Sequence, residues 1–186
     1  MDAVSTAMRE VRREGFLRRA DRRRADYDGP LGIGHHQTNS QPRTVAEMLR
    51  LLDVRAGQRA LDVGAGSGWT TALLARLVGQ TGEVRGVEIV PELAQWGARN
   101  LARTDQPWAS LLEAEPGVLG LPAHAPYDRI LVSAEPDRLP GELVAQLDLD
   151  GGILVIPVAG EMLRVVRHGD EHEVTRHGRY RFVPLV

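Results

Sequence analysis

Short apolar runs alternate with helix-periodic segments along most of this chain. Five of the runs read as β-strands, because they are short, rich in aliphatic residues and bounded by polar residues, Gly or Pro. They are RALDV at 59–63, VRGVEI at 84–89, ASLLEA at 109–114, RILVSA at 129–134 and GILVIPV at 152–158. Apolar strands separated by amphipathic helices are typical of a parallel sheet covered by helices on both faces.

The predicted helices lie before and between these strands. One starts near Pro42, a residue type that suits a first helical turn. The apolar residues after it follow the helical period of 3.6, namely Val45, Met48, Leu49 and Leu52. Further helices are expected from Trp69 to about Leu77, from Pro91 to about Arg103, with Leu93 and Trp96 on its buried side, and from about Pro140 to Gln146.

The two ends of the chain have different patterns. Residues 2–26 are expected to be helical, and YDGPLGIG at 27–34 ends that helix with a Pro and three Gly. From Met162 onward, apolar and polar residues alternate around a Gly-Asp turn, which predicts an antiparallel hairpin at one sheet edge. The pattern as a whole predicts a doubly wound α/β fold in one domain, 1–186.

Composition narrows the class of protein. The chain has 42% apolar and 26% charged residues, which is ordinary for a soluble globular domain. No apolar run is long enough to span a membrane and the N-terminus has no apolar signal core, so we expect a cytoplasmic protein without a membrane partner. The chain has no Cys and no Lys, which excludes disulfides, thiol nucleophiles, Schiff-base lysines and Walker-type phosphate loops.

Charge is concentrated near the N-terminus. Residues 9–24 contain eight Arg and three acidic residues, whereas the formal net charge of the chain is −2. The segment reads as a solvated helical face or as an arm that binds polyanions. General nucleic-acid binding is not expected from the net charge.

LDVGAGSGWTT at 61–71 joins the first strand to a helix and carries the clearest chemical pattern. Gly64, Gly66 and Gly68 allow a tight turn whose backbone N–H groups face a ligand. A dinucleotide fold places another Gly three residues after the second, but that position is Trp69, so a smaller nucleoside ligand is favoured. Such a turn also occurs as strand packing without a ligand. Because Ala65 stands two residues before Ser67, the nucleophile elbow of serine hydrolases is excluded.

Two acidic residues flank this turn. Asp62 precedes it, and Glu88 ends the next strand, where its carboxylate is placed to accept hydrogen bonds from both ribose hydroxyls. Together with the turn they favour S-adenosylmethionine as the ligand. A third feature is the polar stretch GHHQTNSQPRT at 34–44, which has no aliphatic side chain and is longer than an ordinary connection. Such a segment before a helix is more often a binding loop than a connector.

The chain resembles the protein-L-isoaspartate O-methyltransferase family over nearly its full length. The matching segments are MREVRREGFL, PLGIGHHQTNSQP, LDVGAGSGWTT, GEVRGVEIVPELA, APYDRILVSA, QLDLDGGILVIPV and RFVPL. The resemblance implies a Rossmann-like methyltransferase sheet in which residues 1–42 form a helical extension and substrate loop, and 43–186 the S-adenosylmethionine-binding core. It implies methyl transfer to the α-carboxylate of L-isoaspartyl residues in damaged proteins, after which the ester closes to a succinimide that reopens partly as aspartate.

The resemblance also implies roles for individual residues. Ser40 would orient the accepting carboxylate, which is already ionised at neutral pH and therefore needs no base. The predicted substrate-binding residues are Thr38, Asn39, Gln41 and Pro42. The predicted cofactor-binding residues are Asp62, Gly64, Ala65, Gly66, Ser67, Gly68, Glu88, Ile89, Glu115 and Gly117.

Four positions depart from the family pattern. Asn39 replaces an apolar Ile and is expected either to change the packing of the loop or to face the substrate, and His36 stands where Gly is common. Glu115-Pro116-Gly117 replaces Gly-Asp-Gly, so Glu115 is a candidate to contact adenine. Glu135 places a carboxylate in the loop after the fourth strand, where it would repel acidic substrates or favour another peptide context.

Other readings stay open. His35 and His36 are expected to hydrogen-bond the substrate or to cap the turn, and His168, His172 and His177 are expected to be exposed strand residues, so no metal is predicted. One alternative function is a methyltransferase for aspartate in one dedicated peptide. The other is a non-catalytic module that binds S-adenosylmethionine or uses its arginine-rich arm. A monomer is expected.

Overall fold

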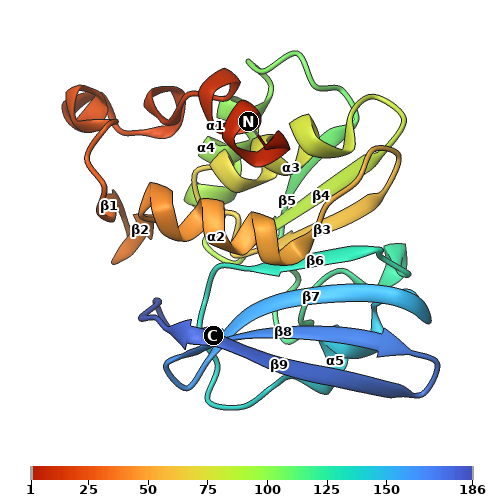
Figure 1. Ribbon diagram of the computed structural model, residues 1–186. Helices are drawn as coiled ribbons and strands as arrows, with labels where there is room; N and C mark the ends of the chain where they lie inside the picture. Colours follow the sequence, from red (N-terminus) through yellow and green to blue (C-terminus); the bar gives the residue numbers. More distant parts are fainter. Residues whose placement is uncertain (1, 186) are drawn as a thin grey trace.

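A seven-stranded sheet organises residues 2–185, the part of the chain that this computed structural model describes (Figure 1). The strands are β3 (Arg59–Val63), β4 (Glu83–Glu88), β5 (Ala109–Glu113), β6 (Arg129–Val132), β7 (Asp150–Val158), β8 (Glu161–His168) and β9 (Glu171–Arg179). Their order across the sheet is β5-β4-β3-β6-β7-β8-β9. β3 to β7 are parallel, whereas β8 and β9 form an antiparallel hairpin at the edge, so both parts of the predicted sheet are confirmed.

The helices between the strands also follow the sequence pattern. They are α2 (Pro42–Leu52), α3 (Trp69–Val78), α4 (Pro91–Leu101) and α5 (Gly141–Ala145). α2 begins at its predicted start, and the other three lie within two residues of their predicted ends. A short 3-10 turn, η3 (Pro122–His124), precedes β6. Leu93 is fully buried as expected. Trp96 is only partly buried, and the guanidinium of Arg18 covers its ring with 3.8 Å between the guanidinium carbon and the ring centroid.

The sheet separates two buried clusters. Side chains alternate between its faces along each strand. Ala60 and Leu131 lie in the cluster formed with α1 to α4, whereas Leu61 and Ile130 lie in the cluster that α5 covers. Because both faces of the parallel strands are buried, the continuous apolar runs of the sequence are explained.

The N-terminal segment differs from the prediction of one helix over 2–26. It consists of α1 (Ala3–Glu10) and two 3-10 helices, η1 (Arg13–Phe16) and η2 (Arg19–Arg24). α1 ends at Glu10, and the carbonyl of the next residue, Val11, accepts the indole N–H of Trp69 at 3.0 Å instead of continuing a helix. Beyond this point Arg13, Phe16 and Leu17 turn into the protein. Tertiary contacts therefore override the local helical pattern.

The polar stretch at 34–44 is not an irregular loop. Its first half belongs to a hairpin of β1 (Leu31–Gly34) and β2 (Gln37–Asn39), and α2 begins directly after it. His35 and His36 form the hairpin turn with positive φ angles of 53° and 59°. A two-residue turn with two positive φ angles favours Gly or Asn, which accounts for the Gly that is common at position 36 in the family that the sequence resembles.

Arg13 holds this hairpin and the segment before it. Its side chain is buried, and its guanidinium donates to the Asn39 side-chain oxygen at 2.6 Å and to the carbonyls of Tyr27 (2.8 Å), Gly29 (2.9 Å), Asn39 (3.0 Å) and Ser40 (3.0 Å). Burial lowers the pKa of Arg13 to about 10, so the group is still cationic at neutral pH. One side chain thus fixes residues 27–29 against residues 39–40.

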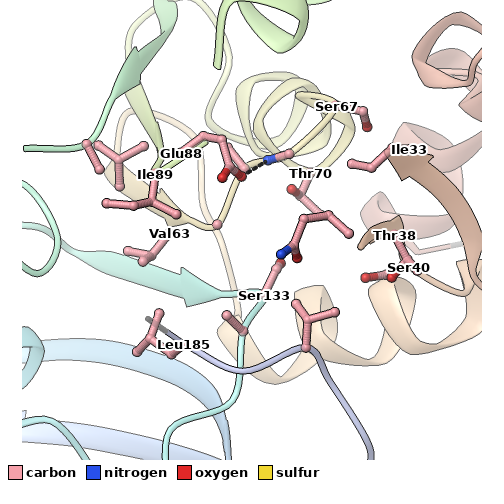
Figure 2. Close-up of a pocket in the computed structure, with 18 of the residues that line it drawn as sticks. Ile33, Thr38, Ser40, Val63, Ser67, Thr70, Glu88, Ile89, Ser133 and Leu185 are labelled. Atoms are coloured by element: carbon pink, nitrogen blue, oxygen red, sulfur yellow. Dashed lines mark hydrogen bonds between the residues drawn. The ribbon is translucent and has the colours of Figure 1, made fainter. Parts of the chain in front are cut away.

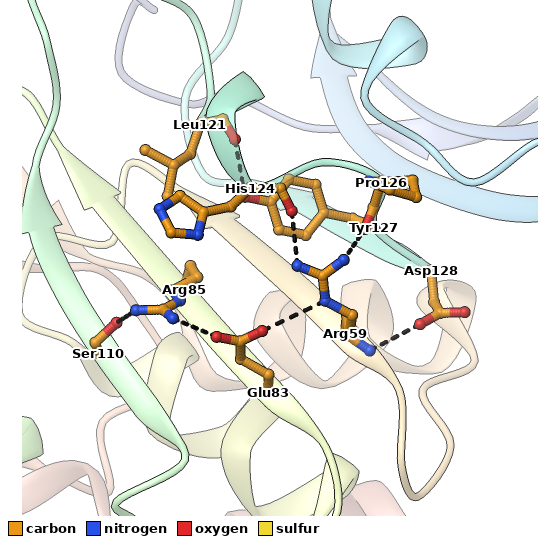
Figure 3. A network of polar contacts seen from close by, with 9 residues as sticks. All are labelled: Arg59, Glu83, Arg85, Ser110, Leu121, His124, Pro126, Tyr127 and Asp128. Carbon is orange, nitrogen blue, oxygen red and sulfur yellow. Dashed lines mark hydrogen bonds and ion pairs between the residues drawn. The ribbon is translucent and has the colours of Figure 1, made fainter.

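A second arginine fixes the opposite end of the sheet (Figure 3). Arg59, at the start of β3, donates through its backbone N–H to Asp128 at 2.7 Å and through its guanidinium to Glu83 at 3.3 Å. It also donates to the carbonyls of His124 at 2.7 Å and Pro126 at 2.8 Å. These contacts close the amino ends of β3, β4 and β6 and leave their carboxyl ends as the open side.

Asp62 lies in the core near the carboxyl end of β3. It is fully buried, and one carboxylate oxygen accepts the hydroxyls of Thr70 and Thr71, each at 2.7 Å, while the other has no partner among residues 2–185. Burial raises the pKa of Asp62 to about 6. The carboxyl group therefore anchors the first turn of α3.

We expect Arg13→Gln to lower the free energy of unfolding by about 3 kcal/mol or more, because it leaves several buried acceptors without their donor. Unfolding in urea measures this loss. The matched control is Arg12→Gln, since the Arg12 side chain is 75% exposed and reaches Glu14 only at 3.8 Å. The control should change stability by less than about 0.5 kcal/mol. Equal losses in the two variants would contradict the role of Arg13.

A second prediction concerns pH. The folded-state pKa of Asp62 lies above its ordinary value of 3.8, so the folded protein takes up this proton at a higher pH than the unfolded chain does. The group therefore adds stability as the pH falls through 6 and its contribution is lost as the pH rises. Relative to Asp62→Asn, the free energy of unfolding of the wild type should rise by about 1 kcal/mol from pH 7 to pH 5. Urea titrations at both pH values test this, and a constant difference between the two proteins would refute it.

Candidate active site

A pocket opens at the carboxyl ends of β3, β4 and β6 (Figure 2). The chain runs from β3 to β4 on one side and later returns to β6 on the other side of β3, which makes this a topological switch point. The lining comes from the turn after β3, the end of β4, the loops after β5 and β6, the β1–β2 hairpin, and residues 183–185 near the C-terminus. The pocket therefore joins the glycine turn to the polar stretch at 34–44.

The glycine turn has the backbone that the sequence predicts. Gly64, Gly66 and Gly68 all have positive φ angles, a conformation that other residue types adopt at a cost. α4 packs directly on this turn, since a side-chain carbon on Gly97 would lie 2.6 Å from the Gly66 carbonyl oxygen. Both the turn and the helix against it need Gly, and Gly97 was not among the predicted site residues.

Glu88 lies beside this turn at the end of β4. Its side chain is buried, and its two carboxylate oxygens accept the backbone N–H groups of Gly66 at 2.8 Å and Val90 at 2.9 Å. Each carboxylate oxygen can accept more than one hydrogen bond, so the group can still bind a hydroxyl in the pocket. Glu88 therefore has two roles available, holding the turn and accepting ligand hydroxyls.

Three hydroxyl groups line the side of the pocket nearest the hairpin. They belong to Thr38, Ser40 and Ser133. Among the described residues, none of the three hydroxyls has a hydrogen-bond partner in the protein, whereas the carbonyl of Ser40 is held by Arg13. Ser133 was missed by sequence reasoning, because it reads only as the end of an apolar strand. Free donors in a half-enclosed site are suited to holding an anionic group.

Asn39 has a structural contact in addition to its place in the pocket lining. Its side-chain oxygen accepts from Arg13, and its amide nitrogen donates to the Ser67 hydroxyl at 2.9 Å. The residue is buried, with 4% of its surface exposed. Of the two expectations for Asn39, altered loop packing is therefore what the structure describes, and this packing links the hairpin to the glycine turn.

Several predicted site residues lie outside the pocket lining, and their predicted contacts with ligand or substrate stay predictions. Asp62 lies beneath the glycine turn, and Gly68 begins α3 and packs against Gly97. Gln41 donates to the Asp28 carbonyl at 3.1 Å, and Pro42 occupies the first turn of α2. These residues support the site through the backbone that they hold.

The loop after β5 also places two predicted cofactor-binding residues outside the pocket lining. Glu115 and Gly117 are exposed and lie outside the lining, whereas Ala114, Val118 and Leu119 of the same loop contribute to it. The apolar residues of the sequence VLG at 118–120 could have predicted this wall, since apolar side chains in a loop tend to pack against a buried surface or a ligand. The wall of the pocket is apolar here, and adenine contact through the Glu115 carboxylate stays a prediction.

Glu135 was expected to present a free carboxylate near the substrate. Instead one carboxylate oxygen accepts the backbone N–H of Gly160 at 2.7 Å and the other accepts that of Phe182 at 3.0 Å. The Glu135 backbone also pairs with Val183 and Leu185. Glu135 thus fastens the C-terminal segment to the loop after β6, and its charge is committed to these bonds.

The histidines show no metal-binding arrangement. His35 and His36 are exposed in the hairpin turn, and the ring of His177 lies 2.7 Å from the Thr175 hydroxyl. Within residues 2–185, no group of three or more His, Cys, Asp or Glu side chains is placed to hold a metal ion.

The helices of this same part of the chain include none that is long and apolar enough to cross a membrane.

Known proteins match this chain along its whole length. Residues 1–186 match the family described as protein-L-isoaspartate(D-aspartate) O-methyltransferase (PCMT). A protein-L-isoaspartate O-methyltransferase of Methanopyrus kandleri is 42% identical over 98% of this chain and 83% of its own length.

Two solved structures are similar to the fold described above. One, a protein-L-isoaspartate O-methyltransferase, has a TM-score of 0.90 at 24% identity and covers all of this chain, which spans 62% of that protein. The other, a Plasmodium falciparum protein of the same name in complex with S-adenosyl-L-homocysteine, has a TM-score of 0.82 at 26% identity and covers 100% of this chain and 91% of its own. This chain belongs to the protein-L-isoaspartate(D-aspartate) O-methyltransferase family.

Proposed function

We propose that this protein transfers a methyl group from S-adenosylmethionine to the α-carboxylate of L-isoaspartyl residues in damaged proteins or peptides. The observation that carries the proposal is one pocket with two different walls. Glu88 and the glycine turn form one wall, and the hydroxyls of Thr38 and Ser40 lie on the other. A nucleoside site beside a carboxylate site is the arrangement that such a transfer needs.

The pocket residues fit S-adenosylmethionine. Glu88 would accept the ribose hydroxyls, while the backbone of Gly64 and Gly66 leaves room for close approach of the cofactor. Val118 and Leu119 provide an apolar wall suited to a base. When bound, S-adenosylmethionine supplies an electrophilic methyl group.

The protein's own task is to align the accepting carboxylate. An α-carboxylate is ionised at neutral pH, so the chain needs no general base. Thr38, Ser40 and Ser133 would donate hydrogen bonds to it and fix its direction. Neutral hydroxyl donors orient the oxygen without the strong charge pairing of an arginine, so the carboxylate keeps its nucleophilic character.

The product would be a methyl ester at the isoaspartyl residue. Such an ester closes to a succinimide with loss of methanol, and hydrolysis of the succinimide gives aspartate in part of the molecules. The overall result is repair of the peptide backbone. We further propose that the protein is a monomer and that, as the composition predicts, it works in the cytoplasm without binding nucleic acid.

The test is a methyl-transfer assay with matched peptides that differ only in an isoaspartyl or an aspartyl residue. We expect methyl incorporation into the isoaspartyl peptide and at least about a hundredfold lower kcat/KM for the aspartyl peptide, because the misplaced carboxylate is no longer aligned. Equal turnover of both peptides would contradict the proposed selectivity for isoaspartyl residues. Cofactor binding without turnover of either peptide would favour one of the two alternatives, a methyltransferase for aspartate in one dedicated peptide or a non-catalytic module.

In the same assay, Ser40→Ala should lower kcat/KM for the isoaspartyl peptide by about ten- to a hundredfold, since one hydrogen bond to the reacting carboxylate is lost. Cofactor affinity should change little. Thr81→Ala, an exposed hydroxyl distant from the pocket lining, is the control and should retain full activity. Full activity of Ser40→Ala would leave the hairpin as a structural cover only.

Glu88→Ala should weaken S-adenosylmethionine binding by about 2 kcal/mol or more, because ribose contacts and the bond that holds Gly66 are both lost. Titration calorimetry measures the dissociation constant. Glu173→Ala is the matched control, because Glu173 is an exposed residue of β9 outside the pocket lining and its loss should not change binding. If the two variants bind equally well, the nucleoside site has been placed wrongly.

A further inference from the structure

A second groove leads away from the active site across the C-terminal segment. Its volume is about 730 Å³, within the range typical of ligand clefts. It shares Thr38, Ser40, Ser133 and Val183 with the active-site pocket. A substrate peptide with one residue bound at these hydroxyls would therefore extend into the groove on one side of that residue.

The groove is lined by cationic side chains. Arg43, Arg179 and Arg181 contribute to its walls, and Glu47 is the single acidic residue of the lining. The Glu47 carboxylate accepts the Tyr180 hydroxyl at 2.7 Å and so belongs to the groove wall. The lining thus has a formal excess of positive charge on a chain whose net charge is −2.

The arginines are available to a ligand. Arg179 and Arg181 are exposed, and no ion pair or side-chain hydrogen bond of either is found among the described residues. Arg43 is 70% exposed and lies 3.4 Å from Asp28. An exposed pair of this kind contributes little, so Arg43 can exchange it for another carboxylate.

The backbone that carries the arginines is fixed. The N–H of Tyr180 donates to the Gly160 carbonyl at 2.9 Å, and that of Phe182 donates to Glu135 at 3.0 Å. Arg181 lies between these two anchored residues. Only the Arg181 side chain, and not its backbone, must therefore become ordered when the guanidinium binds a ligand. This limits the loss of conformational entropy on binding.

We propose that this groove selects isoaspartyl peptides with acidic residues near the isoaspartyl position, and that Arg43, Arg179 and Arg181 determine this selectivity. The inference rests on the proposed function, since the groove is defined by its junction with the site for the accepting carboxylate. We favour a peptide over other anions as the ligand, because the groove continues from the pocket that would already hold the isoaspartyl residue of that peptide. Acidic side chains complement the arginines at the rim, where charge mainly governs specificity and capture.

The experiment compares two isoaspartyl peptides that differ in having Glu or Gln at the two positions on each side of the isoaspartyl residue. For the wild type at low salt, kcat/KM should be about fivefold higher for the Glu peptide. The difference should be mainly in KM and should shrink at about 0.5 M NaCl, where exposed charges are screened. Equal kcat/KM for the two peptides would overturn the inference while the proposed function stands.

Variants locate the effect. The double variant Arg179→Gln and Arg181→Gln should bring the ratio of kcat/KM for the two peptides to within about twofold of unity. Arg176→Gln is the control, because Arg176 lies on the same strand as Arg179, pairs with Glu161 at 3.1 Å and is outside the groove. Arg43→Gln tests the arginine that α2 contributes to the groove, and it replaces the double variant if that protein is unstable. Undiminished preference in both groove variants would overturn the inference.

Two further outcomes are distinct. If neither peptide is methylated by the wild type, the proposed function itself fails and the groove loses its substrate. If a short single-stranded RNA binds in the groove and inhibits methylation of both peptides equally, with no preference for the Glu peptide, the groove is a polyanion site and the peptide inference is overturned. Competition with inorganic phosphate at the same ionic strength separates specific binding from screening.

Discussion

The buried guanidinium of Arg13 is the interaction on which the active-site side of this protein depends. It donates to the Asn39 side chain and to four backbone carbonyls, which belong to segments that form no sheet with the main fold. A carbonyl that is removed from water must find a donor, and Arg provides several in one rigid plane. Without it, residues 27–29 and the strand that ends at Asn39 would each need another donor. The N-terminal extension is thus the structure that gives the hairpin its position.

This constraint reaches the glycine turn through Asn39. The Asn39 side chain accepts from Arg13 and donates to Ser67, so a short chain of hydrogen bonds joins the extension, the hairpin and the turn. Glu88 then joins the same turn to the end of β4. Residues that would hold the accepting carboxylate and residues that would hold the cofactor are consequently parts of one bonded frame. Alignment of two reactants requires such a frame, because small displacements at the reacting atoms are costly in rate.

The sequence predicted the parts of the fold that repeat a period. Strands β3 to β7, helices α2 to α4 and the edge hairpin were predicted from apolar spacing, with Gly and Pro marking their ends, because those elements bury one or both faces. The prediction of a single helix over residues 2–26 was wrong. Nothing in an arginine-rich run distinguishes Arg13, which is buried, from its exposed neighbours. β2 was missed because a strand of three polar residues has no period, and β1 was missed because its two Gly and the Pro before it were taken as signals that end a helix. Ser133 and Gly97 were not predicted, because their places at the site depend on tertiary contacts. Glu88 was predicted, because an acidic residue at the end of the second strand is recognisable from the local sequence.

Two of the departures from the family pattern, Asn39 and Glu135, are polar residues near the pocket. Their polar atoms are hydrogen-bonded to other parts of the protein. The groups left to meet a substrate are then neutral hydroxyls inside the pocket and arginines along the adjoining groove. This division has a physical reason. A guanidinium beside the reacting carboxylate would stabilise the ground state of that nucleophile and slow its attack, whereas a guanidinium several residues away adds binding without touching the reacting oxygen. Charge at the groove and neutral donors at the centre allow the protein to bind acidic peptides while the accepting carboxylate stays reactive.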